Sequence, residues 1–309
     1  CNTERMYGEP HKRETISKVF KMTQIAIYGF NFTKKITFDG GELTPIFSSW
    51  SELKKNGWDN DRYILTGFFK PNSNNYATQQ QLIFDLQAVL SFIEQKNVII
   101  SGELENDETP FNFKPSLPKK LDKKRDKGAG IIIMEDYFAP NSRENFICLA
   151  MEKLNSKAML KQDAFRTSFF KSMLAFRDSI NYIDVRYYLL FSALEALCRF
   201  IKNDYSPAKT PQIITQVLKE YGFNVEKTGH TLAQRNIMHY CKLRHSLFHN
   251  GKYIAYLDEK NSDGKIEIQD YSSNLNLLVP LVLMKFIGFD DNYINWDSWI
   301  DRNPFISKK

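Results

Sequence analysis

The stretch VRYYLLFSALEALCRFI, residues 185–201, is predicted to form a helix that is apolar on most of its faces. A helix that is apolar nearly all round is one that other elements cover on every side. Asp184 stands directly before the stretch and belongs to the residue types that cap helix N-termini. We therefore expect the C-terminal half of the chain to be a group of helices packed around this central one.

Further helices are expected before and after this segment, over residues 143–157, 163–180, 210–223, 231–249 and 272–289. The first two carry apolar side chains at three- and four-residue spacing. Thr210 is the expected N-cap of the third, with Pro211 at its first helical position. Pro280 predicts a kink or a late start in the last one. A hairpin-like or loose segment with Asp263-Gly264 as its turn separates the last two helices.

The first half of the chain mixes strands with a helix. β-branched and aromatic runs predict strands within residues 21–47, 61–70, 97–104 and 128–138. The turn signal Asp39-Gly40-Gly41 divides the first of these runs. A helix is expected over residues 77–95, because four apolar residues share one of its faces: Leu82, Leu86, Val89 and Ile93.

These patterns predict an α+β protein of two domains, as a length of 309 residues suggests. A mixed α/β domain rich in strands, over residues 1–145, would serve recognition or regulation. An all-α bundle of about four long helices would follow over residues 146–309.

Composition favours a cytoplasmic protein. The four cysteines show neither CxxC nor metal-finger spacing, which suits a reducing compartment. No signal peptide is expected, because no apolar run follows a basic start. The longest apolar stretch, residues 275–289, is short for a membrane span and contains Lys285, so we expect a buried helix and no membrane contact. A net charge of +6 is compatible with a polyanionic partner and equally with a slightly positive surface.

A basic cluster lies in a proline-containing segment between two expected strands, and it consists of Lys119, Lys120, Lys123, Lys124, Arg125 and Lys127. One interpretation is a solvated loop, and the other is a basic arm that binds a phosphate backbone. Nothing in the segment itself distinguishes the two.

The stretch KLRHSLFHNGKY, residues 242–253, concentrates an arginine and two histidines at the end of an expected helix. Arg244 and His249 are five residues apart, about 140° on a regular helix, and would not share a face. Asn250-Gly251 predicts a left-handed stop, near which the last turn can loosen and bring His249 toward Arg244. His245 and His249 share a face if the helix stays regular.

Arginine and histidine together suit phosphodiester chemistry. The guanidinium fork matches phosphate, and imidazole gives or takes a proton near neutral pH. RNA carries its own nucleophile, the 2′-hydroxyl, so cleavage needs only a base, an acid and positive charge, without a metal or cofactor. Two alternatives remain open. Basic residues at a helix C-terminus also compensate the helix dipole. A zinc site of His245 and His249 with His239 or Cys241 lacks an obvious third ligand.

RHSLFH, residues 244–249, resembles the R-x(4–6)-H signature of the HEPN superfamily, in which a polar residue such as His245 follows the arginine. YYLLFSALEALCRF, residues 187–200, resembles the preceding core helix of that family, which often carries a glutamate like Glu195. LRHSLFHNGK resembles the ApeA-like branch, with Asn250 as a minor departure between His249 and Gly251. The resemblance covers roughly residues 150–290.

The resemblance implies a bundle of four or five helices that dimerises with two motifs facing each other. It implies a metal-independent endoribonuclease of anti-phage defence or a toxin–antitoxin system, acting on RNA such as tRNA, with a trigger or antitoxin protein as a further partner. Arg244 would hold the scissile phosphate, His249 would transfer protons and His245 would orient them, with Asn250 in support. Glu195 would hydrogen-bond the arginine, or else be a buried structural carboxylate. The basic cluster and Lys252 would contact RNA. The alternative is a non-catalytic HEPN module that binds RNA or a protein.

Overall fold

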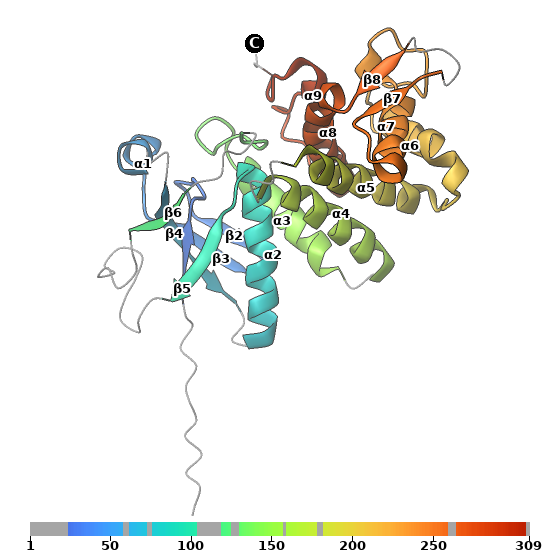
Figure 1. Ribbon diagram of the computed structural model, residues 1–309. Helices are drawn as coiled ribbons and strands as arrows, with labels where there is room; N and C mark the ends of the chain where they lie inside the picture. Colours follow the sequence, from blue (N-terminus) through green and yellow to red (C-terminus); the bar gives the residue numbers. More distant parts are fainter. Residues whose placement is uncertain are drawn as a thin grey trace, which may run out of the picture.

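The computed structural model describes residues 24–57, 62–72, 76–103, 119–124, 130–156, 159–177, 182–258 and 264–306. Within these ranges the chain combines a small antiparallel sheet with many helices, as Figure 1 shows. The sheet and its two helices come from the first part of the chain, and the remaining helices lie beside them. Among the described helices, none has both the length and the apolar character that crossing a membrane requires.

The sheet is built on one long central strand. Its strands are β1 (Ile25–Tyr28), β2 (Ile36–Phe38), β3 (Gly41–Pro45), β4 (Arg62–Pro71), β5 (Ile99–Glu103) and β6 (Lys120–Lys124). Their order is β2-β3-β4-β1-β5, and β6 pairs with the N-terminal part of β4. All pairings are antiparallel. The turn predicted at Asp39-Gly40-Gly41 is confirmed as the link between β2 and β3.

Two layers of apolar side chains cover the sheet. Ile25 and Ile27 of β1 join the main core, which also holds the predicted apolar face of α2 (Tyr76–Glu94). Ala26 and Tyr28 point into a smaller cluster on the opposite face. This alternation follows from the period of two along a strand. The helix predicted over residues 77–95 is therefore confirmed, together with its buried face. A short helix, α1 (Trp50–Gly57), contacts β4.

The C-terminal part contains α3 (Ser142–Asn155), α4 (Met159–Arg177), α5 (Ile183–Lys202), α6 (Thr210–Glu220), α7 (Ile237–Asn250), α8 (Gln269–Ile287) and α9 (Ser298–Asp301). Helix α5 contacts α4, α6, α7 and α8, so its predicted central position is confirmed. The main hydrophobic core runs without interruption from the sheet and α2 into these helices. The two parts of the chain thus share one core.

Several expectations about element ends are wrong. Tyr182, not Asp184, occupies the N-cap of α5, and Lys209, not Thr210, that of α6. Helix α7 begins only at Ile237, because a 3-10 turn and the hydrogen-bonded Asn236 side chain precede it. Pro280 lies inside α8, which starts eleven residues earlier at Gln269, so no late start occurs.

Two predicted elements differ from the structure. Ile132 and Ile133 are buried but belong to no strand, because the Ile132 N–H bonds to the carbonyl of Ile93 at the end of α2 rather than to a neighbouring strand. The C-terminal part is not all-α, since β7 (Ile254–Tyr256) and β8 (Lys265–Glu267) form a hairpin. This hairpin confirms the hairpin-like segment expected there. Asp263 lies outside the described residues.

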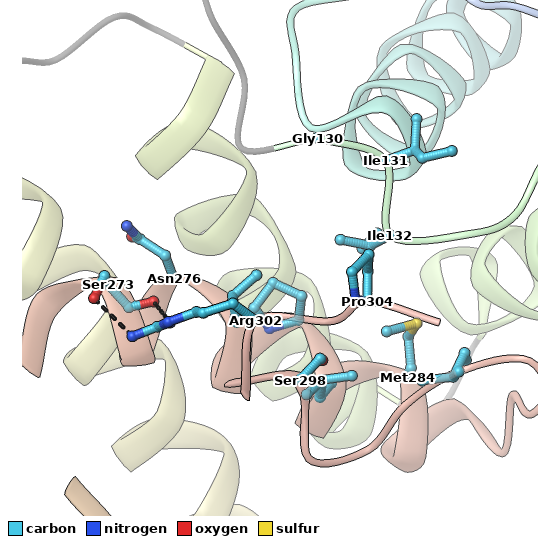
Figure 2. A pocket seen from close by; sticks show the side chains of 13 residues that line it. Gly130, Ile131, Ile132, Ser273, Asn276, Met284, Ser298, Arg302 and Pro304 are labelled. Carbon is cyan, nitrogen blue, oxygen red and sulfur yellow. Dashed lines mark hydrogen bonds between the residues drawn. The ribbon is translucent and has the colours of Figure 1, made fainter. Parts of the chain in front are cut away.

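A cavity of about 470 Å³ lies between the segment 130–132, α8 and the C-terminal residues 294–304. Figure 2 shows Ile131 and Ile132 on one side and Met284, Pro304 and Arg302 around it. Among the described lining residues, Arg302 alone carries a charge, and it donates to the carbonyl and hydroxyl of Ser273 at 3.0 and 2.9 Å. The described lining therefore offers no acid–base pair.

Candidate functional site at the end of helix α7

Helix α7 stays regular to its last residue, Asn250. Gly251 then adopts the left-handed conformation at φ 62°, and its N–H donates to the carbonyl of Leu247 at 3.0 Å. The predicted left-handed stop is confirmed. The predicted loosening of the last turn is wrong, because Gly251 takes up the whole change of direction after the helix has ended. His249 does not swing back toward Arg244 within this chain.

The side chains form two pairs instead, each at a spacing of four residues. The Arg244 guanidinium lies over the ring of Phe248, 5.3 Å from its centroid. The rings of His245 and His249 lie 4.5 Å apart at an angle of 44°. On a regular helix these four residues span an arc of about 140°, with His245 between Arg244 and His249. His245 and His249 therefore share a face, as expected, and Arg244, which is half-buried, lies at the other edge of the same arc.

The arginine edge of this arc is apolar. The rings of Phe248 and Tyr188 lie 4.9 Å apart, and both side chains are exposed. They line a shallow cavity of about 350 Å³ together with Asp184, Val185, Leu247, Gly251 and Tyr253. Aromatic side chains that are left exposed together mark a surface suited to a partner.

The histidine edge borders a polar groove of about 370 Å³ between α7 and β7. The residues that line it are Met238, Cys241, Lys242, His245, Ser246, Asn250, Lys252, Ile254, Ala255 and Tyr256. Two hydrogen bonds hold the hairpin against the helix: Lys242 Nζ donates to the Tyr256 carbonyl at 3.2 Å, and Ser246 Oγ donates to the Ile254 carbonyl. The groove is therefore formed by the packing of the hairpin against α7.

No hydrogen bond or ion pair within the described ranges occupies Arg244, His245 or His249. This separates Arg244 from the arginines that have a carboxylate partner, which include Arg62, Arg143, Arg166, Arg199 and Arg235. A guanidinium keeps its charge at any physiological pH. Arg244 is thus available to an anion from outside the chain.

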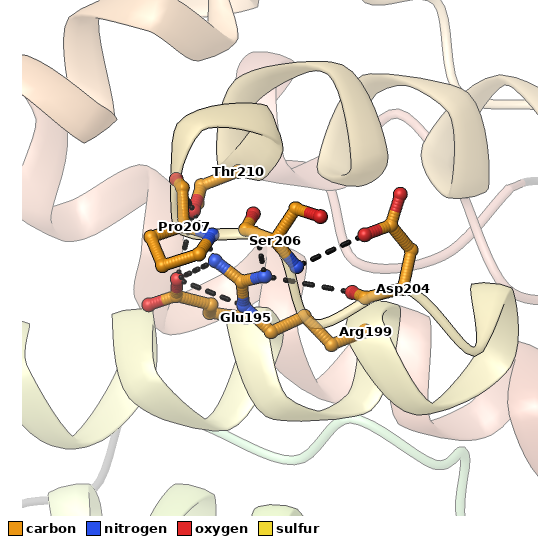
Figure 3. Close-up of polar contacts among 6 residues, drawn as sticks. All are labelled: Glu195, Arg199, Asp204, Ser206, Pro207 and Thr210. Atoms are coloured by element: carbon orange, nitrogen blue, oxygen red, sulfur yellow. Dashed lines mark hydrogen bonds and ion pairs between the residues drawn. The ribbon is translucent and has the colours of Figure 1, made fainter.

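Glu195 does not bond to Arg244, and its expected catalytic support is replaced by a structural contact. Its Oε1 accepts hydrogen bonds from Nε and Nη2 of Arg199 at 3.1 and 2.8 Å and from Thr210 Oγ1 at 2.9 Å (Figure 3). Arg199 also donates to the carbonyl of Ser206 at 3.0 Å. The cause is geometric, because Arg199 lies one helical turn from Glu195 and reaches it first. The network fixes the α5–α6 connection.

The alternative zinc site finds little support in the side chains present. Among the residues that the structure describes, no group of three or more His, Cys, Asp and Glu is arranged to hold a metal ion. Burial raises the pKa of Cys241 to about 12, which keeps its thiol neutral. His239 lies at the start of α7, where its Nδ1 contacts the Tyr271 hydroxyl at 2.8 Å, and burial lowers its pKa.

The basic cluster is separate from the site. Lys120, Lys123 and Lys124 belong to β6, an edge strand rather than the loop or arm expected, and Lys119 directly precedes it. Lysines on an edge strand discourage further strand pairing. Strand β6 and α7 lie on opposite sides of the molecule (Figure 1). Arg125 and Lys127 fall outside the described residues. Lys252 and Asn250, by contrast, line the groove beside His245.

Lys242 and Tyr256 belong to this site but were not predicted from the sequence. Lys242 lies three residues before His245, a spacing that places both on one helix face and was readable from the sequence. Tyr256 reaches the groove only because the hairpin folds back on α7. Comparison with known proteins adds no candidate: no family model, no curated protein and no solved structure matches this chain.

Proposed function

We propose that the end of α7 is the catalytic site of a metal-independent endoribonuclease of the HEPN type. The observation that carries the proposal is the half-buried guanidinium of Arg244, which has no hydrogen-bond or ion-pair partner among the described residues and lies on the same helix arc as the His245–His249 pair. A positive charge and a proton-transfer group, His249 with His245 beside it, are then offered to one polyanion. The resemblance of residues 244–249 to the R-x(4–6)-H signature supports the same assignment.

The proposed reaction uses the RNA's own 2′-hydroxyl. A neutral imidazole takes the 2′-hydroxyl proton while the oxygen attacks phosphorus, and the bond from phosphorus to the 5′-oxygen breaks. An imidazolium gives its proton to that leaving oxygen, so the products are a 2′,3′-cyclic phosphate and a 5′-hydroxyl. Arg244 stabilises the charge on the phosphate. In this proposal His249 transfers protons, and His245 orients its ring through their 4.5 Å contact.

A second copy of the chain would complete the site. Arg244 and His249 lie at the two edges of one arc, so a phosphate held by both would fit better between two α7 ends that face each other. The exposed rings of Phe248, Tyr188 and Tyr253 beside Arg244 provide apolar surface for such a symmetric contact. The resemblance implies a dimer of this kind and a role in defence or a toxin–antitoxin system, whereas the cysteine pattern is what favours the cytoplasm.

The experiment is cleavage of end-labelled RNA, including tRNA, in EDTA. We expect Arg244→Ala and His249→Ala each to lower the rate by about 10²- to 10⁴-fold. Arg62→Ala is the matched control, because Arg62 is exposed, is bonded to Asp122 and begins β4, which lies on the opposite side of the molecule from α7 (Figure 1). Circular dichroism and sedimentation would show that fold and assembly survive. Equal cleavage by all the proteins would rule the proposal out.

The second candidate is a non-catalytic module that binds RNA or a protein partner. The exposed aromatic surface at Tyr188, Phe248 and Tyr253 favours it, since it suits binding as well as dimerisation. RNA binding that depends on Arg244, without cleavage even after a trigger or partner protein is supplied, would favour this alternative.

A further inference from the structure

The groove beside His245 has the size and lining of a ligand site. Its volume of about 370 Å³ lies within the range of small-molecule sites, which is roughly 300–1,000 Å³, and admits one nucleotide. One wall is α7, and the other is the β7–β8 hairpin that Lys242 and Ser246 hold in place. A ligand in the groove would lie directly against His245.

The charges along the groove favour an anion. Lys242, Lys252 and His245 line it, and none of the described lining residues is acidic. Lys242 gives one of its three ammonium protons to the Tyr256 carbonyl and keeps two for another acceptor. Glu267, which lies opposite Ile254 on the hairpin, is paired with Lys265 at 2.7 Å. The groove runs along α7 from Met238 to Asn250, and the lysines in its lining are Lys242 and Lys252.

An exposed aromatic ring completes the groove. Tyr256 lines it and remains 42% exposed. Aromatic rings beside a basic groove bind nucleobases by stacking. A base can stack on a side chain only when it is not stacked and paired within a duplex. The combination therefore selects unpaired nucleotides.

The two sides of the helix end differ in what they suit. The cavity beside Arg244 is apolar, contains Asp184 and exposes Phe248 and Tyr188, which favours a protein surface. The groove beside His245 is basic and favours a polyanion.

We infer that the α7–hairpin groove holds a nucleotide of single-stranded RNA next to the scissile phosphate, with its phosphate at Lys242 and Lys252 and its base on Tyr256. This inference rests on the proposed ribonuclease function, because only a ribonuclease has a scissile phosphate beside the groove. The predicted RNA binding itself does not require cleavage. Lys252 and Tyr256 are then binding and positioning residues that set the substrate class.

The test measures binding by the full chain carrying Arg244→Ala, so that the RNA stays intact. Fluorescence anisotropy would follow a labelled 12-nucleotide unstructured RNA and the corresponding duplex. We expect the single strand to bind at least about fivefold more tightly than the duplex. Lys252→Glu and Tyr256→Ala should each weaken single-strand binding about tenfold or more, and Tyr256→Phe should change it less than twofold. Lys70→Glu makes the same charge change on the exposed side of β4 and should have little effect.

The outcomes separate this inference from the proposed function. Unchanged affinity in Lys252→Glu and Tyr256→Ala, equal affinity for the duplex, or no RNA binding at all would overturn the groove assignment, whatever the nuclease assay shows. If RNA binding depends on the groove residues but the wild-type protein never cleaves RNA, the groove assignment stands and the proposed nuclease activity is ruled out. If wild type does cleave, Tyr256→Ala should raise KM about tenfold and leave kcat within about threefold, whereas a merely structural role would lower both with the melting temperature.

Discussion

Two arginines on neighbouring helices show opposite arrangements of the same side chain. Arg199 on α5 is bonded to Glu195, to the Ser206 carbonyl and to the Thr210 hydroxyl (Figure 3). Arg244 on α7 has only the face of Phe248 beneath it among its described neighbours. The first guanidinium has used its donors to fix the α5–α6 connection. The donors of the second have no acceptor among the described residues, so they remain available to the proposed ligand.

The difference separates stability from function. A residue whose polar atoms are all satisfied inside the fold stabilises the native state when present and destabilises it when removed. A charged group left unsatisfied near the surface adds little to stability, and its cost is tolerated where it serves binding. Substitutions at the two arginines should therefore affect different measurements.

The largest contrast is expected in the free energy of unfolding. Arg199→Ala leaves the Glu195 carboxylate, which is 17% exposed, without its main partner, and should cost about 2–3 kcal/mol. Arg244→Ala should change it by less than about 0.5 kcal/mol. Urea unfolding of both variants would measure the two free-energy changes. A double-mutant cycle should find coupling between Glu195 and Arg199 and none between Glu195 and Arg244, and the opposite pattern would restore Glu195 to the site.

The contact of Glu195 also shows how much of the structure can be predicted from the sequence. Glu195 and Arg199 are four residues apart, the spacing of helical ion pairs, so their contact was predictable from the sequence. Helices α2 to α8 and strands β1 to β5 followed from periodicity and turn residues, whereas the short helices α1 and α9 were not predicted. The segment at Ile132 and Ile133 looked like a strand because burial alone produces an apolar run.

What escaped prediction depends on tertiary contacts. The regular last turn of α7 follows from how Gly251 and the docked hairpin end the helix, and residue spacing does not report it. The groove is formed by residues such as Lys242 and Tyr256, which are 14 positions apart and meet only when the hairpin folds back. The position of the basic strand β6 far from α7 depends on its pairing with β4. Periodicity identifies elements, but contacts between elements decide the site.

The next effect concerns the geometry of the Arg244 fork. Arg244→Lys keeps the charge but replaces a planar set of donors with a single ammonium, so the cleavage rate should fall about 10- to 100-fold. The fold should be unaffected, since no carboxylate within the described structure depends on this side chain. Single-turnover cleavage measures the rate. Full activity in the lysine variant would mean that charge alone is required and that no bidentate contact forms.

A smaller effect is expected where helices end at glycine. Gly251 at φ 62° and Gly222 at φ 84° both have open space where a Cβ would stand. Changing either to alanine therefore costs only backbone strain, about 1 kcal/mol in each case. Thermal melting should show equal shifts. Gly251→Ala should also slow cleavage severalfold by disturbing the end of α7, while Gly222→Ala, at the end of α6, should not. Equal cleavage rates in both variants would show that the conformation at the end of α7 does not affect cleavage.

The smallest effect is expected in the pH dependence of stability, through His239 at the start of α7. Burial lowers the pKa of His239 from its usual value near 6.5, while its Nδ1 lies 2.8 Å from the Tyr271 hydroxyl. The unfolded chain therefore takes up this proton at a higher pH than the folded one, so stability present above about pH 6.5 is lost as the pH falls. We expect the free energy of unfolding to decrease between pH 7.5 and 5.5, and His239→Gln to make that decrease shallower. Because the exposed His245 and His249 remain in the variant, an unchanged slope would trace the pH dependence to other groups and show that the start of α7 does not sense protons through His239.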